Sequence, residues 1–113
     1  MIPMKNYHDY KVCIDACLKC AALCNHCASA CTQEENVNMM AKCIRLDMEC
    51  AALCYASAQL MTMGSELSSR ICMLCAQACE HCANECSKHD HHHCQECARA
   101  CRECAQHCRE MAA

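Results

Sequence analysis

The cysteines of this chain recur at alternating intervals of three and four residues, and this spacing constrains the fold more than any other feature. An alternation of three and four places successive side chains along one stripe of an α-helix. Three runs keep the alternation without interruption, so each predicts a helix with an inward face made of thiols. The three runs contain Cys13, Cys17, Cys20, Cys24, Cys27 and Cys31; Cys72, Cys75, Cys79, Cys82 and Cys86; and Cys94, Cys97, Cys101, Cys104 and Cys108.

A sparser segment between the first two runs keeps the same register with fewer thiols. Cys50 follows Cys43 by seven residues, Cys54 follows by four more, and the skipped stripe position is Asp47. The segment therefore predicts a further helix of the same kind, in which a carboxylate takes the place of one thiol.

Breaks in the cysteine pattern mark the ends of the helices. The lone Gly64 and the polar segments after Cys31 and before Cys94 divide the chain. They predict helices over residues 5–31, 36–63, 66–88 and 91–111, with Asp90 as the cap of the last. Connections this short make consecutive helices antiparallel neighbours. We therefore expect an all-α fold, an antiparallel four-helix bundle with a Cys-lined core, as a single domain over residues 1–113.

The composition requires that thiols fill the interior. Nineteen of the 113 residues are cysteine, whereas Leu, Ile, Val and Phe together number 13. A hydrocarbon core needs a larger aliphatic share than this. The single Gly, the single Pro and the absence of Trp and Phe exclude β-rich folds, Gly-rich phosphate loops and aromatic platforms for bases.

Charge and hydropathy restrict the classes of binding partner and the cellular compartment that we expect. The net charge is −3 and the ten basic residues are scattered, so we expect neither nucleic acid nor a membrane surface as a partner. No stretch is apolar enough to span a bilayer, and the first residues do not resemble an export signal, which predicts a cytosolic protein. The cytosol keeps thiols reduced, and nineteen is an odd number, so complete pairing as disulfides is excluded. Metal binding is the remaining use for so many thiols.

Charge balance selects among the metals. Tetrahedral Zn²⁺ sites with four thiolates each would take about five ions and leave about nine negative charges buried. Cu(I) is a soft ion that accepts few ligands and lets sulfurs bridge, so about one ion per thiolate neutralises the core. We therefore predict multiple Cu(I) ions as the bound metal. A zinc or mixed-metal buffer of the metallothionein type stays as an alternative, and a thiol-disulfide oxidoreductase is a weaker one, because no βαβ pattern surrounds any Cys-x₂-Cys pair.

Nearly the whole chain resembles the bacterial copper storage proteins, and within them the cytosolic subgroup. The resemblance is carried by the Cys-x₃-Cys-x₂-Cys runs, by the segment from Cys43 through Asp47 to Cys50, and by the histidine-rich segment from Lys88 to Cys97. It implies a homotetramer of bundles that stores Cu(I) without catalysis, limits copper toxicity and exchanges copper with chaperones or cuproenzymes. It also implies that copper enters at one open end of the bundle.

The resemblance further implies that non-thiol donors assist the 19 cysteines near the entrance. The candidates are Asp47 and the histidines of the last connection. His89 lies three residues after Cys86 and His91 three residues before Cys94, so both continue a cysteine stripe and are predicted ligands. His92 and His93 are expected to point away from the stripe.

Overall fold

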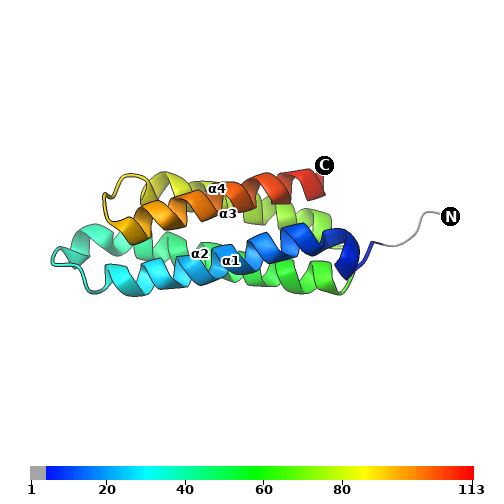
Figure 1. Ribbon diagram of the computed structural model, residues 1–113, viewed down its shortest axis with the longest axis horizontal. Helices are drawn as coiled ribbons and strands as arrows, with labels where there is room; N and C mark the ends of the chain where they lie inside the picture. The colour runs from blue at the N-terminus through cyan, green and yellow to red at the C-terminus, as the bar shows by residue number, and fades with distance from the viewer. Residues whose placement is uncertain (1–4) are drawn as a thin grey trace.

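The computed structural model describes residues 5–113, and its helices form one elongated bundle (Figure 1). A short 3₁₀ helix leads into the second long helix. The described part of the chain contains no β-strand, and the prediction of an all-α four-helix bundle is confirmed. The elements are α1 (Tyr7–Cys31), η1 (Val37–Met40), α2 (Ala41–Thr62), α3 (Ser68–Cys86) and α4 (His92–Ala112).

Each helix packs against the helices next to it in sequence, and α4 closes the bundle against α1. The α1–α2 and α3–α4 connections (residues 32–40 and 87–91) lie together at one end of the bundle. We call this end, together with the adjoining ends of the four helices, the histidine end. The α2–α3 turn lies at the other end, beside the start of α1 and the end of α4 (Figure 1). We call this the turn end (residues 63–67).

The interior consists almost entirely of thiols and alanine methyl groups. All 19 cysteines are buried, and the most exposed of them, Cys13, is 2% exposed. Alanines such as Ala21, Ala76 and Ala98 are fully buried next to the stripes. Protonated thiols behave as small apolar groups, so they fill a narrow core between closely packed helices.

Capping and backbone geometry place the helix ends slightly differently from the predictions. Asn6 and Asp9 form a capping box at the start of α1, two residues after the predicted start. Residues 37–40, expected as the first turn of an α-helix, are 3₁₀ instead. The cap of α4 is His91, which has an extended backbone, so the prediction of Asp90 as the cap is wrong.

The turn end is closed by a tight reversal of the chain. Gly64 has a φ of 66°, a left-handed conformation that glycine adopts without a steric penalty. A Cβ at this position would lie 2.7 Å from the backbone oxygen of Lys5, so the turn also fits closely beneath the start of α1. In residues 5–113, no helix has both the length and the apolar character of a membrane span.

Candidate metal centre

The sulfur atoms form one continuous column along the bundle axis. Within single helices, six Cys-x₃-Cys pairs hold their Sγ atoms 3.8–4.0 Å apart. Between helices the spacing is similar: Cys50 Sγ lies 3.5 Å from Cys79 Sγ, and Cys20 Sγ lies 3.7 Å from Cys101 Sγ. A metal–sulfur bond of about 2.3 Å is long enough for an ion to bond to both members of such a pair.

Neighbouring sets of sulfurs share members. Cys20 and Cys50 belong to one group of four together with Cys24 and Cys101, and to another together with Cys54 and Cys79. Cys24 and Cys101 recur in a third group, with Cys82 and Cys97. Because a sulfur that belongs to two groups must bridge if both are filled, the column suits bridging thiolates better than separate tetrahedral centres.

The thiols are free, and burial disfavours their ionisation. None of the 19 cysteines is in a disulfide. Burial raises the pKa of the Cys31 thiol to about 12, and it raises the pKa of the Cys94 thiol above its ordinary value as well. Without metal, these thiols at the histidine end hold their protons at neutral pH, so a metal ion must displace them.

Asp47 lies inside the column, as its place on the stripe predicts. Its carboxyl group is fully buried, and Oδ1 lies 3.1 Å from the Sγ of Cys82, 3.3 Å from that of Cys97 and 3.4 Å from that of Cys86. Oδ2 lies 3.9 Å from Cys43 Sγ. Burial, together with the charge of Cys97, raises the pKa of Asp47 to about 8. The geometry places one carboxyl group within reach of four sulfurs.

His93 is the histidine that reaches the sulfur column, so the expectation that it points away is wrong. Its Nδ1 lies 3.4 Å from Cys27 Sγ, 3.5 Å from Cys94 Sγ and 3.9 Å from Cys31 Sγ. The sequence carried one signal for this position, because His93 stands four residues before Cys97 and so lies on the same face of α4.

Glu34 orients His93 from the α1–α2 connection. Its Oε1 lies 3.0 Å from His93 Nε2. When Nε2 donates its proton to this carboxylate, Nδ1 presents a lone pair to the three sulfurs. A histidine held between a carboxylate and a metal is a common arrangement in metal sites. Glu34 lies outside every periodic pattern of the sequence, so no sequence signal points to it.

The structure does not bring His89 and His91 to the sulfurs. The ring of His89 binds the carboxylate of Glu85 at 2.8 Å through Nε2. His91 Nδ1 lies 3.5 Å from Oε2 of Glu34, and its ring stacks on that of His93. Both side chains belong to the rim of the column. His91 precedes the first turn of α4, so the helical register that predicted its direction does not apply to it.

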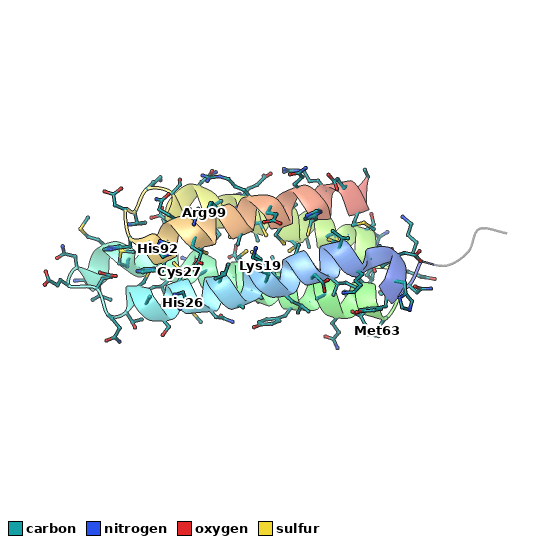
Figure 2. All side chains as sticks on the ribbon, in the orientation of Figure 1. Lys19, His26, Cys27, Met63, His92 and Arg99 are labelled. Carbon is teal, nitrogen blue, oxygen red and sulfur yellow. The ribbon has the colours of Figure 1, made fainter. Side chains whose placement is uncertain are left out.

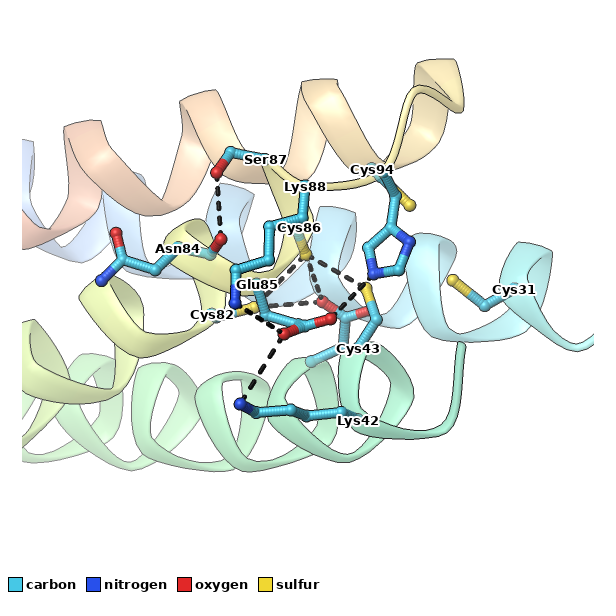
Figure 3. Close-up of polar contacts among 12 residues, drawn as sticks. Cys31, Lys42, Cys43, Cys82, Asn84, Glu85, Cys86, Ser87, Lys88 and Cys94 are labelled. Atoms are coloured by element: carbon cyan, nitrogen blue, oxygen red, sulfur yellow. Dashed lines mark hydrogen bonds and ion pairs between the residues drawn. The ribbon is translucent and has the colours of Figure 1, made fainter. Parts of the chain in front are cut away.

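Glu85 connects this rim to two helices. The carboxylate lies 3.8 Å from the amino group of Lys42 on α2 and 3.7 Å from that of Lys88, next to Cys43 and Cys86 (Figure 3). A pocket of about 420 Å³ opens at the histidine end, lined by residues that include Glu34, Met40, His89 and His91. The side chains around this pocket thus include acidic and imidazole groups, and they form a mouth at one end of the thiol column.

Two further histidines, His26 and His92, lie outside the column, and for His92 this agrees with the direction expected from the register. His26 is exposed on α1 while the adjacent Cys27 is buried, and His92 is exposed at the start of α4 (Figure 2). Alternation along each helix therefore separates an outer polar surface from an inner surface of sulfur.

Four antiparallel helices around a column of free thiols, with a buried carboxylate and an imidazole at one end, define a thiol-rich metal-binding bundle. The family model described as copper storage protein matches residues 6–113. The chain therefore belongs to the copper storage protein family, and the resemblance inferred from the sequence is confirmed.

Solved structures agree with this family assignment. The Cu(I)-bound copper storage protein BsCsp3 is 48% identical, with a TM-score of 0.88 over 91% of this chain and 97% of that one. Apo-Csp3 from Bacillus subtilis is 48% identical, with a TM-score of 0.87 over 91% and 98%. A cytosolic copper storage protein from Streptomyces lividans, with five coppers, is 39% identical, with a TM-score of 0.88 over 91% of each chain. No curated protein sequence gives a significant match.

Proposed function

We propose that this protein stores Cu(I) in the cytosol, holding about one ion per cysteine along the core of the bundle. The observation that carries the proposal is the sharing of sulfurs between neighbouring groups of four, as in the two groups that contain both Cys20 and Cys50. Bridging thiolates raise the ratio of ions to sulfurs towards one, which is what storage requires. The family membership and the Cu(I)-bound and cytosolic relatives support the same function.

We propose the 19 cysteines and Asp47 as ligands, with His93 added at the histidine end. His93 already faces three sulfurs. The predicted ligand roles of His89 and His91 require each ring to exchange its partner, Glu85 or Glu34, for copper. These two histidines are therefore better placed to receive an ion at the mouth than to hold one in the column.

Storage needs no catalytic step, and we propose that the protein is not an enzyme. A thiol-disulfide oxidoreductase needs one accessible thiolate that can attack a disulfide, whereas every cysteine of this chain is buried. Sequestration limits the toxicity of free copper, and release to chaperones or cuproenzymes would proceed through the histidine end.

The whole chain, residues 1–113, is proposed as one domain, of which residues 1–4 lie outside the described residues. We also propose the homotetramer that the resemblance implies. Leu67 and Leu74 are each 51% exposed, and burying such side chains between bundles would stabilise an assembly. Light scattering coupled to size-exclusion chromatography tests this assembly.

An anaerobic titration tests the function. The reduced, metal-free protein is titrated with Cu(I) in the presence of a competing chromophoric chelator. Saturation at about one ion per cysteine supports storage. Saturation at about four or five ions would favour separate tetrahedral centres and the zinc alternative, which a parallel titration with Zn²⁺ would then examine.

A further inference from the structure

Sixteen of the 19 cysteines form eight Cys-x₃-Cys pairs along the helices, and three stand outside these pairs. Residues four apart on a helix face the same side, so each pair can hold an ion between its own two sulfurs. The three remaining cysteines need a different partner for the same task. They are Cys43, Cys72 and Cys94.

Each of these three cysteines contacts a donor that is not a thiol. Cys43 lies 3.9 Å from Oδ2 of Asp47, at the position where a fourth-residue cysteine would stand. Cys94 lies 3.5 Å from Nδ1 of His93. Cys72, at the turn end, lies 3.5 Å from Sδ of Met61. Asp47 and His93 lie towards the histidine end of the bundle. The contact between Cys72 and Met61 lies at the opposite end, apart from them.

We propose that the thioether of Met61 is a Cu(I) ligand that completes, with Cys72, the last site of the column at the turn end. The proposal rests on the function proposed above and extends it to a residue outside the thiol set. Met61 belongs to α2 and Cys72 to α3, so an ion bound by both residues would join two helices.

Two methionines of the described residues lie in the core, Met40 at the histidine end and Met61 at the turn end, so Met61 is the buried thioether next to Cys72. Met61 stands seven residues after Cys54 on the cysteine stripe of α2, and its side chain is fully excluded from solvent. Met39, Met48 and Met63 are all more than 60% exposed. A thioether is a soft donor of the kind that Cu(I) prefers.

Charge favours a neutral donor at this position. Cys13 and Cys108, whose Sγ atoms lie 3.8 Å apart, and the buried Ile14 belong to the same core cluster as Cys72. A Cu(I) ion between one thiolate and one thioether carries no net charge. An additional thiolate would leave a buried negative charge in this part of the core, with no further cation to neutralise it.

X-ray absorption at the selenium edge tests the bond directly. The full chain is produced with selenomethionine and saturated anaerobically with Cu(I). We expect a copper neighbour at bonding distance from about one in nine selenium atoms, since the chain has nine methionines. The same measurement on the Met61→Leu variant should lack it. An identical spectrum for the two loaded proteins would overturn the proposal.

Competition with a chelator gives a second readout. Met61→Leu keeps the volume and the apolar character of the side chain, so the bundle should stay folded, which circular dichroism verifies. One ion should bind at least about tenfold more weakly, while the remaining ions load as before. Met63→Leu is the matched control, because Met63 is 69% exposed. Unchanged binding in Met61→Leu would contradict the ligand role, whereas failure of the unaltered protein to load would contradict storage itself.

Discussion

Asp47 Oδ1 lies 3.1 Å from Cys82 Sγ, across the contact between α2 and α3. The carboxyl group is fully buried among thiols, and its pKa is raised to about 8, chiefly by burial. In the metal-free protein at neutral pH it is therefore mostly protonated. Copper that reaches this position must displace a proton from oxygen as well as from sulfur.

Asp47→Asn should make the free energy of unfolding of the metal-free protein less sensitive to pH. Asp47 titrates near 3.8 when unfolded and near 8 when folded, so between these values the folded state binds more protons. The stability that protonated Asp47 contributes is complete below about pH 4 and is lost as the pH rises towards 8, by on the order of a few kcal/mol. The Asp47→Asn variant should lose much less stability between pH 4 and pH 8.

Urea unfolding of the reduced, metal-free proteins at several values between pH 4 and pH 8.5 provides the measurement. The thiols that do not contact Asp47 contribute equally to both slopes, so the difference between the slopes reports on Asp47 and the thiols next to it. Equal slopes of unfolding free energy against pH would show that the carboxyl group is not titrating as its burial requires.

His93→Ala should weaken copper binding at the histidine end. The change removes the nitrogen that faces Cys27, Cys31 and Cys94, and about one ion should bind roughly tenfold or more weakly. Glu34→Gln should act in the same direction to a smaller extent, because it weakens the orientation of the ring. Chelator competition under anaerobic conditions measures both effects.

His92→Ala is the matched control for this experiment, since His92 is exposed and adjacent in sequence. Its isotherm should coincide with that of the unaltered protein. If His92→Ala and His93→Ala gave the same isotherm, the assignment of His93 to the column would fail.

Ser57→Cys should raise the copper capacity by about one ion. Ser57 is fully buried on the α2 stripe, three residues after Cys54, and its hydroxyl donates to the backbone oxygen of Ile71 at 3.4 Å. A thiol of similar size would extend the row of sulfurs towards Met61. The saturation point of the Cu(I) titration measures the gain, and the conservative Ser57→Ala variant should show none.

Gly64→Ala should destabilise the bundle without changing its copper capacity. The left-handed backbone and the 2.7 Å approach of a Cβ to the Lys5 oxygen both oppose a side chain. We expect a loss of about 1–3 kcal/mol in the free energy of unfolding. Thermal unfolding of the metal-free protein measures it, and a midpoint equal to that of the unaltered chain would contradict the tight packing of this turn.

The cysteine spacing was sufficient to predict the bundle and the inner position of every thiol. A period that alternates between three and four defines one face of a helix, and four such faces have no stable arrangement except around a common axis. The buried position of Asp47 follows from the same rule, because Asp47 occupies a stripe position within a continuous helix.

The histidines could not be assigned in this way. His89 and His91 lie between helices, where backbone direction depends on contacts rather than on a period. Their partners, Glu85 and Glu34, come from α3 and from the α1–α2 connection, and only the folded structure brings these groups together. Register counted back from Cys94 points to His91, whereas register counted back from Cys97 points to His93, and the spacing alone does not decide between them.

The tight fit of Gly64 beneath Lys5 and the complete burial of Met61 and Cys72 close the thiol column at the turn end. If copper enters at the histidine end, as proposed above, ions would have to return by the same route, so the order of departure would reverse the order of arrival. The deepest ions would then turn over most slowly. The protein would hold a long-lived reserve behind a small fraction that is quick to draw on.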